Sequence, residues 1–198
     1  NTTITAYVSD NALKALAWSR NGSMLVTGGV GKQLYVLDTS LRPLRDPIPV
    51  DGRVWDVKFS EFYLGVALGD YTVRLLNDKF EFILKIDRTR TCRCLEFHPT
   101  LPIVAIGDGA ETVAIVDYEE GEIVTEWNAG DRVNVIVFSR SDFMVVGTDQ
   151  GIFSLYETVT FRKIQEIAVG GFALTAAFAK NGQYLALGTE GDGLQLIR

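Results

Sequence analysis

Histidine and cysteine are almost absent from this sequence, which limits the chemistry that the protein can perform. The 198 residues include one histidine, His98, and two cysteines, Cys92 and Cys94. Most zinc sites and most histidine-dependent catalysis need more of these side chains. Cysteines two positions apart are too close for an easy disulfide. We therefore expect reduced thiols and an intracellular protein, cytoplasmic or nuclear.

Long apolar runs and an excess of positive charge are also missing. No apolar run approaches the roughly 18 residues that a membrane helix needs, so no membrane span is predicted. The 19 Lys and Arg residues are outnumbered by 25 Asp and Glu residues, which gives a net charge of −6. This balance argues against a general nucleic-acid or membrane-surface binder. With 47% apolar and 22% charged residues, the chain has a globular composition that excludes disorder.

What the sequence does contain is a repeat of about 40 residues. Five segments of alternating apolar residues end in an aromatic residue, with spacings of 41, 38, 41 and 40: Trp18, Phe59, Phe97, Phe138 and Phe178. Each aromatic residue is followed by a turn and by an apolar strand that ends in a glycine: Gly28, Gly69, Gly107, Gly147 and Gly188. Glycine at these strand ends predicts either a positive φ or a close backbone approach.

Two more strands complete each repeat. A third apolar strand is predicted over 34–38, 73–77, 113–117, 153–157 and 194–198, and a more polar fourth strand over 44–50, 80–86, 122–127 and 162–167. Pro47 and Pro49 cannot donate ladder hydrogen bonds, so the fourth strand is expected to be outermost. Four short strands per repeat predict an all-β fold, a β-propeller of four-stranded antiparallel blades with about 19–20 strands. No helical period is present, so no helix longer than about two turns is expected.

The repeats are predicted to form one domain over 1–198, because no linker or low-complexity stretch divides the chain. The blade repeats cover approximately 12–50, 51–87, 88–129, 130–168, and 169–198 plus 1–8. Residues 2–8 are expected to form the fourth strand of the last blade, because propellers often close their ring in this way. About five blades are therefore expected, as a closed five-blade ring or as part of a larger propeller.

The repeats resemble those of the WD-repeat (Trp-Asp repeat) β-propeller family over essentially the whole chain. Where that family has Trp-Asp, the third strands here end in Leu37-Asp38, Leu76-Asn77, Val116-Asp117, Tyr156-Glu157 and Ile197-Arg198. The family's Gly-His dipeptide is missing, and its turn aspartate matches Asp70 well and Asp149 loosely. The repeats are therefore degenerate, and apolar packing is expected to replace the family's buried polar network. The resemblance implies a non-catalytic scaffold that binds a partner protein or peptide on the rim formed by the inter-blade loops.

The candidate partner-binding residues lie in the loops that enter the inner strands: Arg53, Trp55, Arg90, Arg93, Arg132 and Asn134. The densest basic run is 88–93, and Arg53 and Arg132 each lie six residues before their aromatic residue. One interpretation is a ring of exposed charges that pair weakly, at about 0–1 kcal/mol per pair. The other is a rim that binds an acidic or phosphorylated peptide. Trp55 is interpreted either as core packing or as a binding anchor, and Trp127 as inter-blade packing.

Catalysis is not predicted, and neither are a cofactor, a metal site or a small-molecule substrate. Asp56 and Glu96 are the only acids on the inner strands, and a solvated or turn-paired role is expected for them and not a catalytic pair. His98 is interpreted as a turn residue, and the glycine-rich 28–32 as a hairpin turn because no helix follows it. Two other functions stay open: a propeller hydrolase or quinoprotein-like oxidoreductase, and a phosphoinositide or nucleic-acid binder through 88–93.

Overall fold

The computed structural model describes residues 3–140, 142–191 and 193–198. Over this part the chain forms 19 strands and no helix. The strands make five antiparallel sheets, which confirms the predicted all-β fold of β-propeller blades. The chain divides into two compact units, Asn1–Cys92 and Arg93–Arg198.

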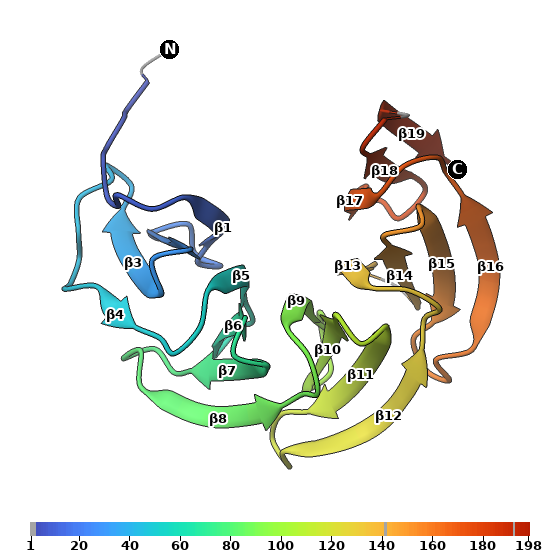
Figure 1. Cartoon of the computed structure of the whole chain (residues 1–198), viewed down its shortest axis with the longest axis horizontal. Helices are drawn as coiled ribbons and strands as arrows, with labels where there is room; N and C mark the ends of the chain where they lie inside the picture. Colours follow the sequence, from blue (N-terminus) through green and yellow to red (C-terminus); the bar gives the residue numbers. More distant parts are fainter. Residues whose placement is uncertain (1–2, 141, 192) are drawn as a thin grey trace. The chain divides into compact units, whose positions relative to one another are not determined.

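The first unit contains two sheets, in which successive strands are neighbours (Figure 1). The first sheet consists of β1 (Leu13–Trp18), β2 (Met24–Gly29), β3 (Gln33–Asp38) and β4 (Ile48–Pro49). The second consists of β5 (Val54–Phe59), β6 (Leu64–Leu68), β7 (Thr72–Leu76) and β8 (Phe82–Asp87).

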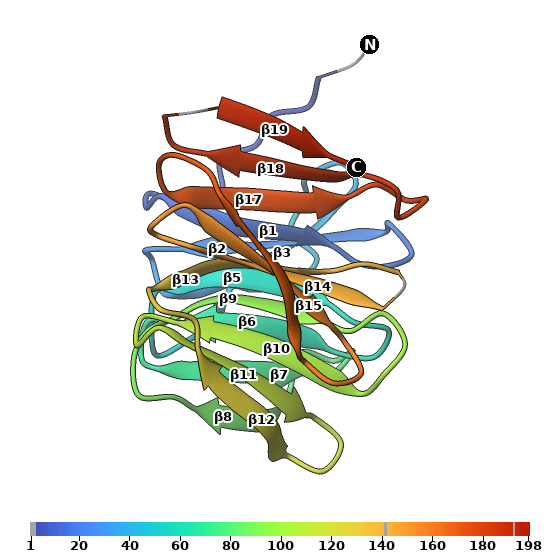
Figure 2. The same ribbon diagram turned by 90° about the vertical axis from the view of Figure 1, so that its right-hand side faces the viewer.

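The second unit contains three sheets with the same strand order, and Figure 2 shows the last of them as three adjacent strands. The first sheet consists of β9 (Cys92–Phe97), β10 (Ile103–Asp108), β11 (Thr112–Asp117) and β12 (Glu122–Asn128). The second consists of β13 (Val133–Phe138), β14 (Phe143–Thr148), β15 (Ile152–Glu157) and β16 (Lys163–Ala168). The third consists of β17 (Ala173–Phe178), β18 (Leu185–Thr189) and β19 (Gly193–Ile197).

The predicted strand over residues 2–8 is not formed. Residues 3–8 have no regular secondary structure and are mostly exposed, and residue 2 lies outside the described residues. The Tyr7 hydroxyl instead donates a local hydrogen bond to Asp10 Oδ1 at 2.6 Å. An alternating apolar segment forms a strand only where it can pair with a neighbouring strand and pack its apolar side chains against a core. Residues 3–8 do neither, which explains the difference from the prediction.

The outermost position of the fourth strand in the first repeat is confirmed. β4 lies at the edge of its sheet and pairs only with β3. It is two residues long, whereas residues 44–50 were predicted, because the prolines interrupt the ladder; Pro43 makes an isolated bridge to Leu37. Proline is tolerated at such an edge since one side of the strand needs no donor.

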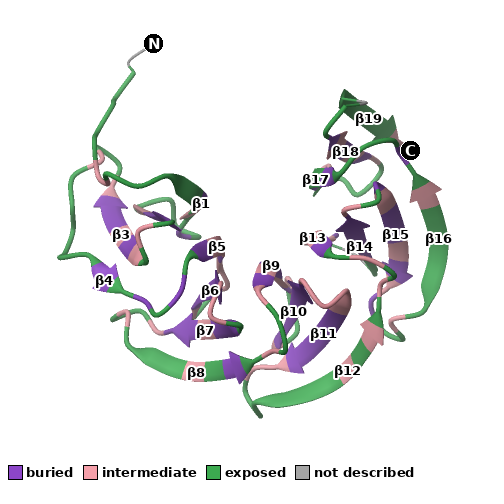
Figure 3. Ribbon diagram, viewed as in Figure 1, coloured by how far each residue is buried: buried purple, intermediate pink, exposed green. Residues whose placement is uncertain are grey.

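Neighbouring sheets within a unit pack face to face through apolar side chains. In the first unit, Val26 and Leu34 lie in one cluster with Val54 and Val57. In the second unit, Trp127 packs against the cluster of the next sheet, and its Nε1 donates to the Tyr156 hydroxyl at 3.0 Å, which confirms its inter-blade role. Figure 3 shows the same gradient in the sheets that end in β8, β12 and β16: the second strand is mostly buried and the fourth is mostly exposed. In the first sheet β2 is also mostly buried, whereas β4 has one buried residue, Ile48, and one exposed residue, Pro49.

A β-bulge interrupts the inner strand in four of the sheets. In β5, Val54 pairs with Leu68 and Asp56 with Ala67, so Trp55 is the extra residue. The same shift in pairing occurs in β1, β13 and β17, where the extra residues are Lys14, Asn134 and Leu174. Each of these residues lies four positions before its aromatic residue. A bulge bends the strand and re-aims the extra side chain, so this position differs from the regular core-facing ones.

Close approach, and not a positive φ, explains the repeat glycines. A Cβ on Gly147 would lie 2.6 Å from Val135 Cγ1 and 2.9 Å from Ala173 Cβ, and its φ is not positive. Glycine therefore allows a strand and the adjacent sheet to approach. Gly69 differs, because it lies beyond the end of β6, and Ala67 takes the paired position in that sheet.

Candidate functional site

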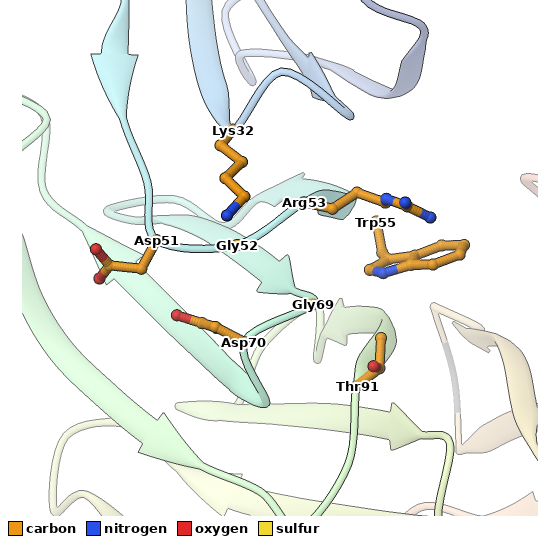
Figure 4. Close-up of a pocket in the computed structure, with 8 residues that line it drawn as sticks. All are labelled: Lys32, Asp51, Gly52, Arg53, Trp55, Gly69, Asp70 and Thr91. Atoms are coloured by element: carbon orange, nitrogen blue, oxygen red, sulfur yellow. The ribbon is translucent and has the colours of Figure 1, made fainter.

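The first unit contains a pocket of about 390 Å³ at the loop that enters β5, which we call the Trp55 pocket (Figure 4). Its lining comes from that loop, from the turns that follow β2 and β6, and from the residue before β9: Lys32, Asp51, Gly52, Arg53, Trp55, Gly69, Asp70 and Thr91. Two of the predicted partner-binding residues, Arg53 and Trp55, belong to this group, and their side chains lie together.

Arg53 and Trp55 form a stacked pair beside the pocket. The Arg53 guanidinium carbon lies 5.4 Å from the centre of the Trp55 ring, and Figure 4 shows both side chains extending the same way from the strand. The bulge places Trp55 in this position, where it is half-buried. Gly69 lies close beneath it, since a Cβ there would be 3.3 Å from Trp55 Nε1. A cation on an indole face is stabilised by about 0.5–1 kcal/mol at exposed sites.

The acids of the Trp55 pocket are held by another arginine. Arg74 Nη2 lies 2.6 Å from Asp51 Oδ2 and 3.6 Å from Asp70 Oδ2. Asp70 also accepts hydrogen bonds from the Thr72 backbone nitrogen and hydroxyl, at 3.1 and 2.7 Å. Asp70 therefore closes the turn between β6 and β7, the position that matches the WD-repeat aspartate.

The two remaining cations of the pocket, Lys32 and Arg53, have no ion pair among the described residues. Lys32 lies in the turn between β2 and β3 and points toward Gly52 (Figure 4). Arg90, another selected residue, is exposed in the loop before β9 and likewise has no ion pair there. These positive charges are available to a ligand, because no carboxylate competes for them.

The second unit gathers the other three selected residues around one carboxylate, which we call the Asp149 cluster: Arg93, Arg132, Asn134 and Asp149. Arg132 Nε lies 2.8 Å from Asp149 Oδ2, and Arg93 Nη2 lies 3.8 Å from Oδ1. The Asn134 amide donates to Asp149 Oδ1 and to the Ala173 carbonyl, the latter at 3.2 Å. The cations of this cluster are therefore paired.

The role of Asp149 as the centre of this cluster was not predicted from the sequence, in which the residue is only a loose match to the turn aspartate of WD repeats. A usable signal was present, because an acid follows the second strand in both repeats that carry an arginine six residues before the aromatic residue. The Asp149 side chain is only 11% exposed, so it needs partners, and Arg132 and Asn134 supply them.

His98 is a turn residue, as predicted. Its Nδ1 accepts hydrogen bonds from the backbone nitrogens of Thr100 and Leu101 at 3.2 and 3.0 Å, and its ring packs edge-on against Phe138 with centroids 5.0 Å apart. Burial lowers the pKa of His98, and the nearby Asp142 charge opposes this shift. The ring is held as a neutral acceptor in this turn.

Among the described residues, no group of three or more His, Cys, Asp or Glu side chains is placed to hold a metal ion. No helix in this part of the chain has the length and apolarity to cross a membrane.

No protein-family model matches the sequence, and a search of curated proteins finds no match.

Proposed function

We propose that this chain is a non-catalytic interaction scaffold that binds an acidic or phosphorylated segment of a partner protein. Propeller blades supply rigid loops on which binding residues are carried. The resemblance of the repeats to WD repeats supports this class of function, although no Trp-Asp dipeptide is present. Both cysteines are buried and carry no disulfide within the described chain, which supports a reducing compartment, cytoplasmic or nuclear.

The main support for this proposal is that the acids of the Trp55 pocket are in ion pairs, whereas two of its cations are not. Arg74 binds both acids, while Lys32 and Arg53 have no carboxylate partner among the described residues. A ligand carboxylate or phosphate would meet two cations beside the face of Trp55, and Trp and Arg are the residue types most enriched in binding hot spots. The blades fix this geometry before binding, which lowers the entropy lost on association.

The test is a selection of peptides from a random library, unmodified and phosphorylated, on the whole chain. Selected peptides are expected to be acidic, and their affinity is expected to fall at least about tenfold in Trp55→Ala and Arg53→Glu. Arg20→Glu is the matched control, because Arg20 is exposed outside the pocket and, within the described part of the chain, forms an ion pair only with Glu61, at 3.3 Å. Its charge change equals that of Arg53→Glu.

The salt dependence distinguishes a charged ligand from an apolar one. Binding through Arg53 is expected to weaken as ionic strength rises, because exposed charges are screened. Selected peptides without acidic residues, or equal affinity in Arg53→Glu and Arg20→Glu, would contradict the proposal.

A further inference from the structure

One threonine of the Trp55 pocket has the surroundings of a phosphorylation site. Thr91 lines the pocket from the loop between β8 and β9, which covers residues 88–91. The residue is partly exposed, and its hydroxyl has no hydrogen-bond partner among the described residues. Figure 4 shows its side chain below the Trp55 ring in that view. A hydroxyl that can react therefore lies at the wall of the site that holds the unpaired cations.

Arginines precede Thr91 in the sequence. Arg90 comes directly before it and Arg88 lies three residues before it. Protein kinases choose their substrates partly by such charge patterns. Thr89 is the contrast within the same loop, because it is exposed, does not line the pocket and has Asp87 two residues before it. The pattern therefore favours Thr91 over Thr89 as the substrate of an arginine-directed kinase.

The pocket supplies cations for a phosphate on Thr91. A phosphorylated threonine carries about −1.5 to −2 charges at pH 7 and three strong acceptor oxygens. Lys32 and Arg53 line the same pocket and have no ion pair within the described part of the chain. Hydrogen bonds between such cations and a phosphate are among the strongest that proteins form.

The acids of the pocket do not prevent this arrangement. Asp51 and Asp70 are both within ion-pair distance of Arg74, at 2.6 and 3.6 Å. Their charges are therefore already compensated in part, which weakens their repulsion of another anion. With Arg74 counted, the cations of this region outnumber its acids.

We propose that Thr91 is phosphorylated by an arginine-directed kinase and that its phosphate occupies the Trp55 pocket in place of a partner's acidic group. Thr91 Oγ1 forms a bond to the γ-phosphorus of ATP, the bond from that phosphorus to the β–γ bridging oxygen breaks, ADP leaves, and the hydroxyl proton passes to the base of the kinase. The phosphate then competes as an intramolecular ligand at high effective concentration. Its effect on a partner rests on the proposed function, whereas the modification and the position of the phosphate do not.

The first test treats the folded whole chain with an arginine-directed Ser/Thr kinase, Mg²⁺ and ATP, and locates the phosphate by mass spectrometry. Phosphate is expected at Thr91 in the wild type and in the control Thr89→Val. Thr91→Val, which keeps the shape of the side chain, should lose it, and Thr91→Ser should restore it. Phosphate at Thr89 alone, or none in the folded chain, would overturn the proposal.

Phosphorus NMR on the phosphorylated chain tests where the phosphate lies. The pKa of its second ionisation, about 6 in solution, is expected to be lower than in the phosphorylated peptide 86–96 by about half a pH unit or more, because nearby cations favour the dianion. Lys32→Gln and Arg53→Gln should each reduce this difference, and Arg20→Gln, outside the pocket, should not. A pKa equal to that of the peptide would place the phosphate in solvent and overturn the proposal.

Peptide binding separates this inference from the proposed function. Phosphorylation should weaken the affinity for the selected acidic peptides at least about tenfold, and phosphorylated Thr89→Val should show the same loss. Equal affinity before and after phosphorylation would overturn the blocking role. A chain that selects no acidic peptide but lowers the pKa of its phosphate would contradict the proposed function and support the modification site.

Discussion

The Trp55 pocket and the Asp149 cluster are built from equivalent repeat positions but use their charges differently. In each repeat an arginine lies six residues before the aromatic residue that ends the inner strand, and the extra residue of the β-bulge lies four residues before it. An acidic residue follows the second strand of each repeat. At the pocket, Arg74 holds the acid and Arg53 lies on the Trp55 ring. At the cluster, the bulged Asn134 donates to the acid, which also pairs with Arg132.

This difference indicates that the residue at the bulge determines whether the neighbouring arginine, Arg53 or Arg132, is available to bind a ligand. An indole offers the guanidinium a surface but no anion, so the charge of Arg53 stays open to a ligand. At the Asp149 cluster the Asn134 carboxamide and Arg132 share one carboxylate, so the charge of Arg132 is paired within its unit instead. Similar repeat positions can thus serve binding in one sheet and stability in another.

Of the changes that separate the two sites, Asp149→Ala should cause the largest loss of stability. It would leave Arg93, Arg132 and Asn134 without their shared acceptor, and we expect a loss of about 2–3 kcal/mol in the free energy of unfolding. The measurement is urea denaturation. Asp51→Ala is the control at the pocket, where the 73% exposed carboxylate should contribute less than about 1 kcal/mol. Equal losses in the two variants would show that the two sites do not differ in this way.

Gly147→Ala should cause the next largest loss of stability. The added methyl would overlap Val135 and Ala173 at 2.6 and 2.9 Å, and overpacking of this kind costs about 1–3 kcal/mol. Gly69→Ala is the matched change at the pocket, where the nearest atom is Trp55 Nε1 at 3.3 Å. It should alter peptide affinity more than it alters the melting temperature. A larger drop in melting temperature for Gly69→Ala than for Gly147→Ala would contradict the assigned roles.

The smallest expected effect is the dependence of folding stability on pH. It should come from the second unit, which holds the only histidine of the sequence, His98. The pKa of His98 is lowered in the folded chain, so the unfolded chain binds a proton more readily, at about pH 6.5. The stability that neutral His98 contributes is present above that pH and is lost as the pH falls through the folded pKa. Thermal unfolding between pH 7.5 and about pH 5 should show this loss, and His98→Asn should reduce it. An unchanged pH profile in His98→Asn would refute the assignment to His98.

Much of the fold could be predicted from the sequence because period and alternation are properties of consecutive residues. The aromatic spacing located the inner strands, and the prolines of 44–50 identified an edge strand correctly. Residues 3–8 misled the prediction because their alternating pattern resembles a strand, while a strand also needs a partner. Gly69 misled it because a count of residues does not reveal where β6 ends.

The candidate sites were predicted only in part, because charge pairing depends on contacts between distant segments. Arg53 and Trp55 are two residues apart, so their proximity could be expected. The link between Asp149 and Arg93 spans two sheets, and no local pattern contains it. The bulges were also invisible, since an extra residue in one strand is defined by the pairing with its neighbour.

The bulge has a consequence for how this protein can change. Lys14, Trp55, Asn134 and Leu174 are chemically unrelated, yet they occupy the same bulged position in four sheets. The regular residues on either side maintain the strand pairing, so the identity of the bulged residue can vary while the sheet is retained. A library randomised at these four positions should therefore keep its fold and vary in what it binds, which makes the bulged position a natural starting point for altering recognition.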